Sequence, residues 1–304
     1  MPDLPIGPVR AALPAVAAAG ALLGVAICGL LAGRAGPEGS AWAAALSLGA
    51  ACLLVGLGGL EYVEARPSRA LIAAVAGFWG ATSLVAAWLE LAGRAGVGPW
   101  RLGLGDLMLG LESGLAPLIC VGGAVLVLIW CARPFAAQVL VAVIAAAGVL
   151  ALSISGHAAT GAWTPLLVGA HALAAAWWTG TLAALAVSVR GRRGWSVSLP
   201  LFSGYALYAA AVLVATGVLA ALVELGVSAR WWDTGYGRVV LAKAAILVVV
   251  LAFAATHRRR WVPAAARHAA PEAVSLRRAA VETILLSVVL GLAAGLATTA
   301  PGVS

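Results

Sequence analysis

Residues 134–189 form an unbroken stretch of 56 residues without a single Asp, Glu, Lys or Arg. Soluble domains carry about 25% charged residues, whereas this 304-residue chain is only 10% charged and is 63% hydrophobic. A single helix needs about 20 apolar residues to cross the hydrocarbon core of a bilayer. The sequence therefore predicts an integral membrane protein built from helices.

Further apolar runs lie on both sides of this stretch, and together they predict about nine transmembrane helices. Residues 134–189 are too long for one helix and divide near 155–165, where Gly and Pro cluster. The expected helices cover residues 11–33, 41–61, 70–91, 113–131, 136–155, 165–189, 201–224, 238–256 and 277–299. The predicted fold class is an all-α polytopic bundle, with a four-helix region at 1–133 and a five-helix region at 134–304.

The basic residues orient this bundle, because cytoplasmic loops of membrane proteins are enriched in Lys and Arg. A cytoplasmic N-terminus places 13 of the 19 basic residues inside and only five outside, so we expect the C-terminus outside. The formal net charge of +8 then indicates topology, and we expect no nucleic-acid partner. The cytoplasmic set is Arg10, Arg66, Arg69, Arg133, Arg190, Arg192, Arg193, Arg258, Arg259, Arg260, Arg267, Arg277 and Arg278.

Other features of the sequence narrow the class of protein. Arg outnumbers Lys 18 to 1, which is typical of GC-rich bacterial genomes and predicts a bacterial plasma membrane protein. We find no P-loop, G-x-S-x-G or H-E-x-x-H pattern, and we expect neither an ATP-driven pump nor an enzyme. Glycines four positions apart would let helices approach closely, although 37 glycines also produce such pairs by chance. These pairs are Gly20/Gly24, Gly29/Gly33 and Gly291/Gly295.

Two histidines are the main candidates for function, because polar side chains are costly inside a bilayer and default to functional hypotheses. His171 lies about six residues into the sixth expected helix, near its outer end, and His157 lies in the outer loop before it. Imidazole is a suitable ligand for copper and zinc. A structural interpretation stays open, in which His157 is solvated and His171 bonds a neighbouring helix.

Four further side chains are supporting candidates. Trp178 lies on the same helical face as His171, and Cys120 in the outer third of the fourth helix offers a thiolate ligand. Lys243 and Glu282 lie near helix ends and are able to pair with opposite charges. For each of them, packing or anchoring at the membrane interface is the alternative.

Four short motifs follow one another in the second half of the chain. They are SGHAA at 155–159, GAHALAAAWWTG at 169–180, TGYGR at 234–238 followed by Lys243, and LRR at 276–278 followed by Glu282. In this combination and order they resemble the CopD family of bacterial copper-resistance and copper-transport membrane proteins, from about residue 150 to the end. One departure is Thr181, where the family usually has a second Gly.

The resemblance implies a copper transporter with His157 and His171 as paired metal ligands and with Lys243 and Glu282 as a buried pair. We expect copper uptake, in which His157 captures the ion outside and His171 passes it inward. The expected partners are the lipid bilayer and a periplasmic or extracellular copper-binding protein. Two alternatives stay open: a haem- or quinone-binding redox membrane protein, and an assembly factor that delivers copper.

Overall fold

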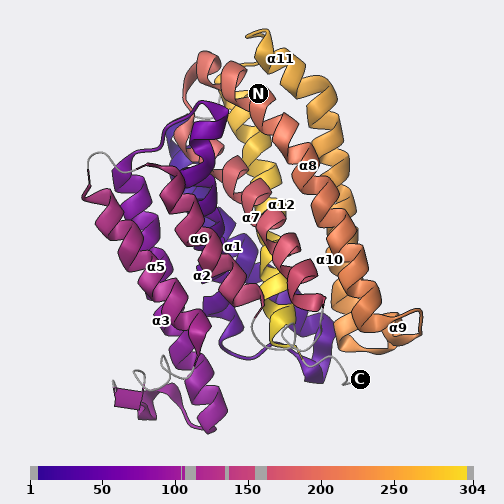
Figure 1. The fold of residues 1–304 in the computed structure, drawn as a ribbon. Helices are drawn as coiled ribbons and strands as arrows, with labels where there is room; N and C mark the ends of the chain where they lie inside the picture. Colours follow the sequence, from indigo (N-terminus) through magenta and orange to yellow (C-terminus); the bar gives the residue numbers. More distant parts are fainter. Residues whose placement is uncertain (1–5, 104, 107–113, 134–136, 155–162, 300–304) are drawn as a thin grey trace.

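The computed structural model describes residues 6–103, 105–106, 114–133, 137–154 and 163–299, and these ranges contain helices and no strands. The long helices lie side by side and run between the two ends of one bundle (Figure 1). They are α1 (Ile6–Ala32), α2 (Ala41–Gly59), α3 (Arg69–Ala95), α5 (Leu115–Cys131), α6 (Val139–Ser153), α7 (Thr164–Ser188), α8 (Gly191–Leu225), α10 (Gly235–Thr256) and α12 (Glu272–Ala297). Short elements are η1 (Gly33–Ala35), η2 (Leu60–Val63), η3 (Pro99–Arg101), α9 (Arg230–Asp233), the π-helical η5 (His257–Trp261) and α11 (Val262–Ala266).

The predicted all-helical membrane architecture is confirmed. Within the described ranges, seven helices are long and apolar enough to cross a membrane. The helices α5 and α6 are also apolar, but they have 17 and 15 residues and fall short of the roughly 20 needed for a full crossing. The count of nine spans and the orientation of the termini in the membrane therefore stay predictions.

Several helices extend beyond the apolar runs that predicted them, as α8 and α12 illustrate. Helix α8 begins at Gly191 instead of 201, because Trp195 and Leu199 in its first turns are buried against the rest of the bundle. Helix α12 begins at Glu272 instead of 277, and its first turns carry the charged side chains that the sequence analysis assigned to a loop. Hydropathy marks the lipid-embedded part of a helix, and the helix itself continues into the interface.

The parallel helices α1 and α12 pack backbone to backbone through glycines. A Cβ atom at Gly24 would meet the backbone of Val288 and Gly291, and one at Gly291 would meet the backbone of Ala21. Close approach of this kind requires small residues on both helices. Two of the glycine pairs in the sequence, Gly20/Gly24 and Gly291/Gly295, thus lie in one contact, and they fix α12 in the bundle.

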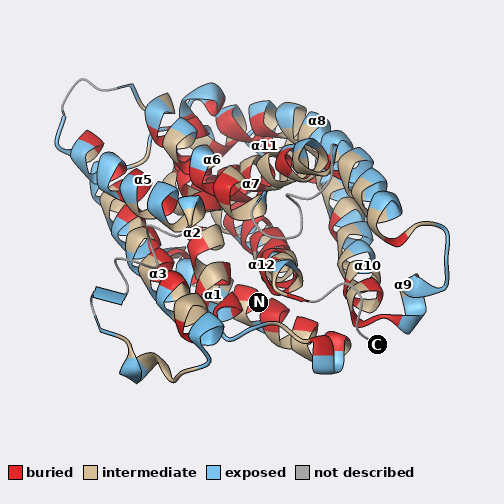
Figure 2. Ribbon diagram, turned by 60° about the horizontal axis from the view of Figure 1, so that its bottom comes forward, coloured by how far each residue is buried: buried red, intermediate tan, exposed pale blue. Residues whose placement is uncertain are grey.

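Burial is uneven across the bundle. The helices α2 and α12 are largely buried, whereas the outward faces of α8 and α10 are exposed (Figure 2). In the most apolar stretch of each helix, 72% of α2 and 67% of α12 are buried, against 11% of α8 and α10. The helices α8 and α10 therefore form the edge of the described bundle, where apolar exposed side chains suit contact with lipid.

A buried arginine joins three helices at one end of the bundle. Arg10 of α1 donates from Nε to the Ala186 carbonyl at 3.1 Å and from Nη2 to the Val189 carbonyl at 2.7 Å, at the C-terminus of α7. Its Nη2 also pairs with Glu272 Oε1 of α12 at 2.9 Å. A cation at this position satisfies helix-end carbonyls and complements the α7 dipole. Arg10 therefore has a structural role as well as its predicted topological one.

Candidate functional site

His171 of α7 is fixed against α8 by a hydrogen bond from its ring. Nδ1 lies 3.0 Å from the Leu213 carbonyl oxygen and 3.3 Å from Thr216 Oγ1. The Thr216 hydroxyl donates its own proton to the Val212 carbonyl at 2.6 Å. Because a carbonyl oxygen only accepts, Nδ1 must carry a proton and donate it. In the neutral imidazole this leaves the Nε2 lone pair available to a ligand or metal ion.

The ring fits between the helices because α8 has a glycine opposite it. A Cβ atom at Gly217 would lie 2.9 Å from His171 Cε1 and 3.2 Å from Nδ1, closer than normal packing permits. Gly217 thus provides the space in which the imidazole approaches the α8 backbone. The hydrogen bond and this close approach together set the orientation of Nε2.

Lys243 of α10 contributes a positive charge to this region, since it interacts electrostatically with the His171 imidazole. The prediction that Lys243 and Glu282 form a buried pair is wrong. The Glu282 carboxylate instead bonds His257, 2.9 Å away. Lys243 lies 14 positions before His257 on one continuous helical stretch, or about 21 Å along its axis. It is therefore too far from Glu282 to pair with it.

The other predicted site residues lie apart from His171. His157 falls outside the described residues. Trp178 is buried in the main core, with 1% of its surface exposed, so its role is packing. Cys120 of α5 is fully buried, and its thiol lies 3.7 Å from the Gly148 carbonyl of α6. Cys120 is thus bonded to α6, whereas His171 is bonded to α8.

No preassembled metal centre exists in the part of the chain that the structure describes. No three or more His, Cys, Asp or Glu side chains come close enough there to hold one ion. His171 is thus a single candidate ligand with an available nitrogen. One such ligand is compatible with transient binding of an ion, whereas a structural metal site would need three or four protein ligands.

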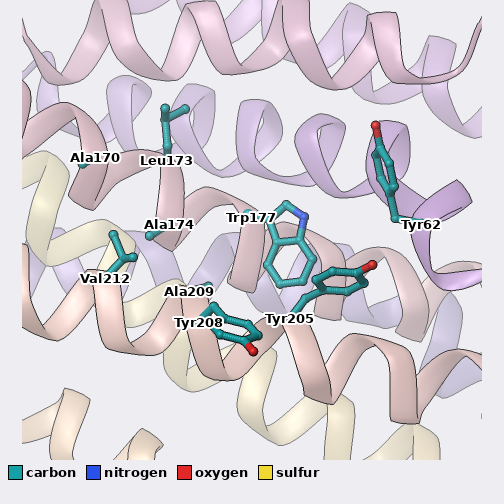
Figure 3. Close-up of a pocket in the computed structure, with 9 residues that line it drawn as sticks. All are labelled: Tyr62, Ala170, Leu173, Ala174, Trp177, Tyr205, Tyr208, Ala209 and Val212. Carbon is teal, nitrogen blue, oxygen red and sulfur yellow. The ribbon is translucent and has the colours of Figure 1, made fainter.

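An apolar groove of about 470 Å³ runs along α7 and α8 beside this histidine. Small and aliphatic side chains such as Ala170, Ala174 and Val212 line one part of the groove, and aromatic side chains line much of the rest (Figure 3). The Trp177 ring stacks on Phe202 with centroids 5.9 Å apart and meets Tyr205 edge-on at the same separation. The full lining is Tyr62, Ala170, Leu173, Ala174, Trp177, Tyr205, Tyr208, Ala209 and Val212.

A second partly buried histidine lies outside the candidates of the sequence analysis. His257 directly precedes three arginines of the cytoplasmic set, yet its side chain is only 12% exposed and bonds Glu282, which is 5% exposed. Both residues belong to helix ends that the positive-inside rule assigns to the same side of the membrane. This shared location, together with the opposite charges that His and Glu carry when ionised, was the sequence signal that could have predicted the pair.

Comparison with protein families matches residues 197–296 to CopD, described as copper resistance protein D. No curated protein and no solved structure matches the chain. The matched range contains Gly217, His257 and Glu282, whereas His157 and His171 precede it. The resemblance indicated by the sequence motifs is confirmed over this range. Residues 197–296 are therefore similar to the CopD family of copper-resistance proteins.

Proposed function

We propose that the protein takes up copper across a bacterial plasma membrane and that Nε2 of His171 binds the ion on the outer side. The observation that carries this proposal is the hydrogen bond between Nδ1 and the Leu213 carbonyl. Histidine metal ligands characteristically donate their second ring N–H to such an oxygen, which fixes the tautomer and orients the lone pair. Leu213 belongs to α8, inside the range that matches CopD.

The depth of His171 also supports a role in transport. Its Cα lies seven positions after the first residue of α7, about 10 Å along the helix axis. In the predicted orientation, this places the ligand below the outer surface, where an ion has already left bulk water. We propose His157 as the second ligand, from the outer loop, and a periplasmic or extracellular copper-binding protein as the donor.

Copper accumulation in proteoliposomes tests this proposal. The informative variant is His171→Asn, because the Asn amide retains a donor toward Leu213 but lacks a nitrogen in place of Nε2. We expect copper uptake to be lost in His171→Asn and in His157→Ala, while both proteins retain the wild-type melting temperature. The matched control is His268→Asn, since His268 is exposed after α11. Wild-type uptake in both variants would refute the assigned roles.

A haem-binding redox protein is the second candidate. The same Nε2 atom is suitable as an axial ligand for haem iron, and the apolar groove beside His171 is lined by aromatic rings. An absorption spectrum of the purified protein separates the two candidates. A Soret band that disappears in His171→Asn would support haem binding and contradict the proposed copper transport. Stoichiometric copper binding without uptake would instead support delivery of copper to another protein.

A further inference from the structure

The contact between His257 and Glu282 brings two ionisable side chains together, and they are only 12% and 5% exposed. His257 Nδ1 lies 2.9 Å from Glu282 Oε2, and the two residues come from α10's continuation and from α12. Ionisable side chains inside membrane-spanning helices are costly, and they commonly mark ion pathways and proton relays. The role proposed for His171 does not use this pair.

The backbone at His257 is unusual as well. Residues His257–Trp261 form a π-helical turn between α10 and α11. Such turns are rare and frequently occur at functional sites. The aromatic rings of Phe253 and Trp261 flank the imidazole, with centroids 6.1 and 5.2 Å away. The π-turn thus presents His257 to Glu282 within an aromatic surround.

The charged groups near the His257–Glu282 pair do not form its direct contact. Arg258 donates to the carbonyl and hydroxyl oxygens of Ser203 on α8. Arg10 of α1 pairs with Glu272 at the start of α12. Arg278 lies one turn before Glu282 on α12. The direct partner that the structure gives the Glu282 carboxylate is therefore the imidazole of His257.

From these contacts we infer that His257 and Glu282 form a proton-binding site at the cytoplasmic end of the bundle, and that its proton moves in step with copper. The ionised carboxylate accepts the Nδ1 proton, so an incoming proton binds Nε2. The pair then changes from a net charge of −1 to a neutral imidazolium–carboxylate pair, and it returns to −1 when the proton leaves. No redox partner is required.

The link between this site and copper rests on the proposed function. Helix α10 carries Lys243, whose charge acts on His171, and continues into the turn that carries His257. Helix α12 carries Glu282 and is fixed to α1 by the glycine contact. A displacement of α10 against α12 would therefore act on both sites, and this displacement is how a proton would be coupled to the ion.

Nuclear magnetic resonance of ¹⁵N-histidine in copper-free nanodiscs tests the proton site itself. The chain has four histidines, and His257→Asn identifies the signal of interest. We expect that signal to change between the imidazole and imidazolium positions in a titration from acidic to alkaline pH, and to change differently in Glu282→Gln. His268→Asn should leave it unchanged. A His257 signal that stays constant over this range would overturn the inference.

Proteoliposomes that contain a pH-sensitive dye test the coupling. We expect copper entry to move protons in the wild type and in His268→Asn, and the proton signal to be lost in His257→Asn and Glu282→Gln while copper still enters. An equal proton signal per copper in all four proteins would overturn the coupling. A wild type that moves no copper would refute the proposed function and the coupling together, and the resonance experiment would still decide the proton site.

Discussion

The two partly buried histidines, His171 and His257, differ in the charge of the group that accepts a hydrogen bond from Nδ1. At His171 the partner is the neutral carbonyl of Leu213, 3.0 Å away, whereas at His257 it is the carboxylate of Glu282, 2.9 Å away. A neutral partner fixes the tautomer and leaves Nε2 as a ligand for a metal ion. A carboxylate partner stabilises the imidazolium form, which suits the exchange of a proton. Similar distances therefore support different chemistry.

The two sites also differ in how the backbone makes room for the ring. At His171 a regular helix contributes Gly217, whose missing Cβ provides the space. At His257 the helix itself changes to a π-turn. A glycine leaves the hydrogen-bonding pattern of α8 intact, while a π-turn interrupts the regular pattern of the helix. The two histidines are therefore positioned by different kinds of local structure.

The same substitution, His to Asn, made separately at each site should produce the largest difference in copper affinity. We expect His171→Asn to abolish copper binding at Nε2, because the amide has no atom in that position. His257→Asn should retain wild-type copper affinity, since that ring is not a proposed ligand. Equilibrium competition with a chelator of known copper affinity measures both. Equal loss in the two variants would remove the distinction between the sites.

Filling the space at Gly217 tests whether the ring orientation matters. In Gly217→Ala the new Cβ would force the imidazole away from α8 and weaken the bond to Leu213. Loss of a group that orients a metal ligand typically costs 10–100-fold in metal affinity, so we expect a decrease of about that size. Gly204→Ala is the control, because a Cβ there meets nothing within 4 Å. The same competition assay applies, and unchanged affinity would contradict the positioning role.

Much of the fold was predictable from the sequence because hydropathy and length govern membrane helices. The apolar runs located each of the long helices, and the four-residue spacings of Gly20/Gly24 and Gly291/Gly295 indicated close packing. Helix ends were less predictable: Trp195 is buried by contacts that are distant in the sequence, and these contacts extend α8 beyond its apolar run.

The candidate site was predictable only in part. His171 stood out because it lies in a stretch without other ionisable groups apart from His157. The partner of Glu282 was mispredicted, since the family motif pointed to Lys243 and the structure pairs Glu282 with His257. Pairing between helices depends on depth along each axis, and a short motif carries no information about depth. His257 did not stand out, because three arginines of the cytoplasmic set follow it directly.

Removing the positive charge of Lys243 should strengthen copper binding at His171. An ammonium group repels a bound cation, and its interaction with His171 places it within electrostatic range. For Lys243→Met we expect a gain on the order of 1 kcal/mol, or about fivefold in affinity. The control Arg238→Met removes a charge that donates to the Leu31 carbonyl instead. Weaker copper binding in Lys243→Met would mean that the amine acts as a ligand or anchor.

The smallest expected effect comes from the second acceptor of the His171 ring. Thr216→Val removes the oxygen 3.3 Å from Nδ1, while the 3.0 Å bond to the Leu213 carbonyl stays. Because Nδ1 keeps its better acceptor, we expect a loss near the lower limit for one hydrogen bond, about 0.5 kcal/mol, or about twofold in copper affinity. His257 should keep its proton exchange, since α8 supplies no acceptor to its ring nitrogen. A tenfold loss of copper affinity in Thr216→Val would show that the hydroxyl, and not the carbonyl, sets the tautomer of His171. The difference between His171 and His257 would then depend on the Thr216 hydroxyl and not on the α8 backbone.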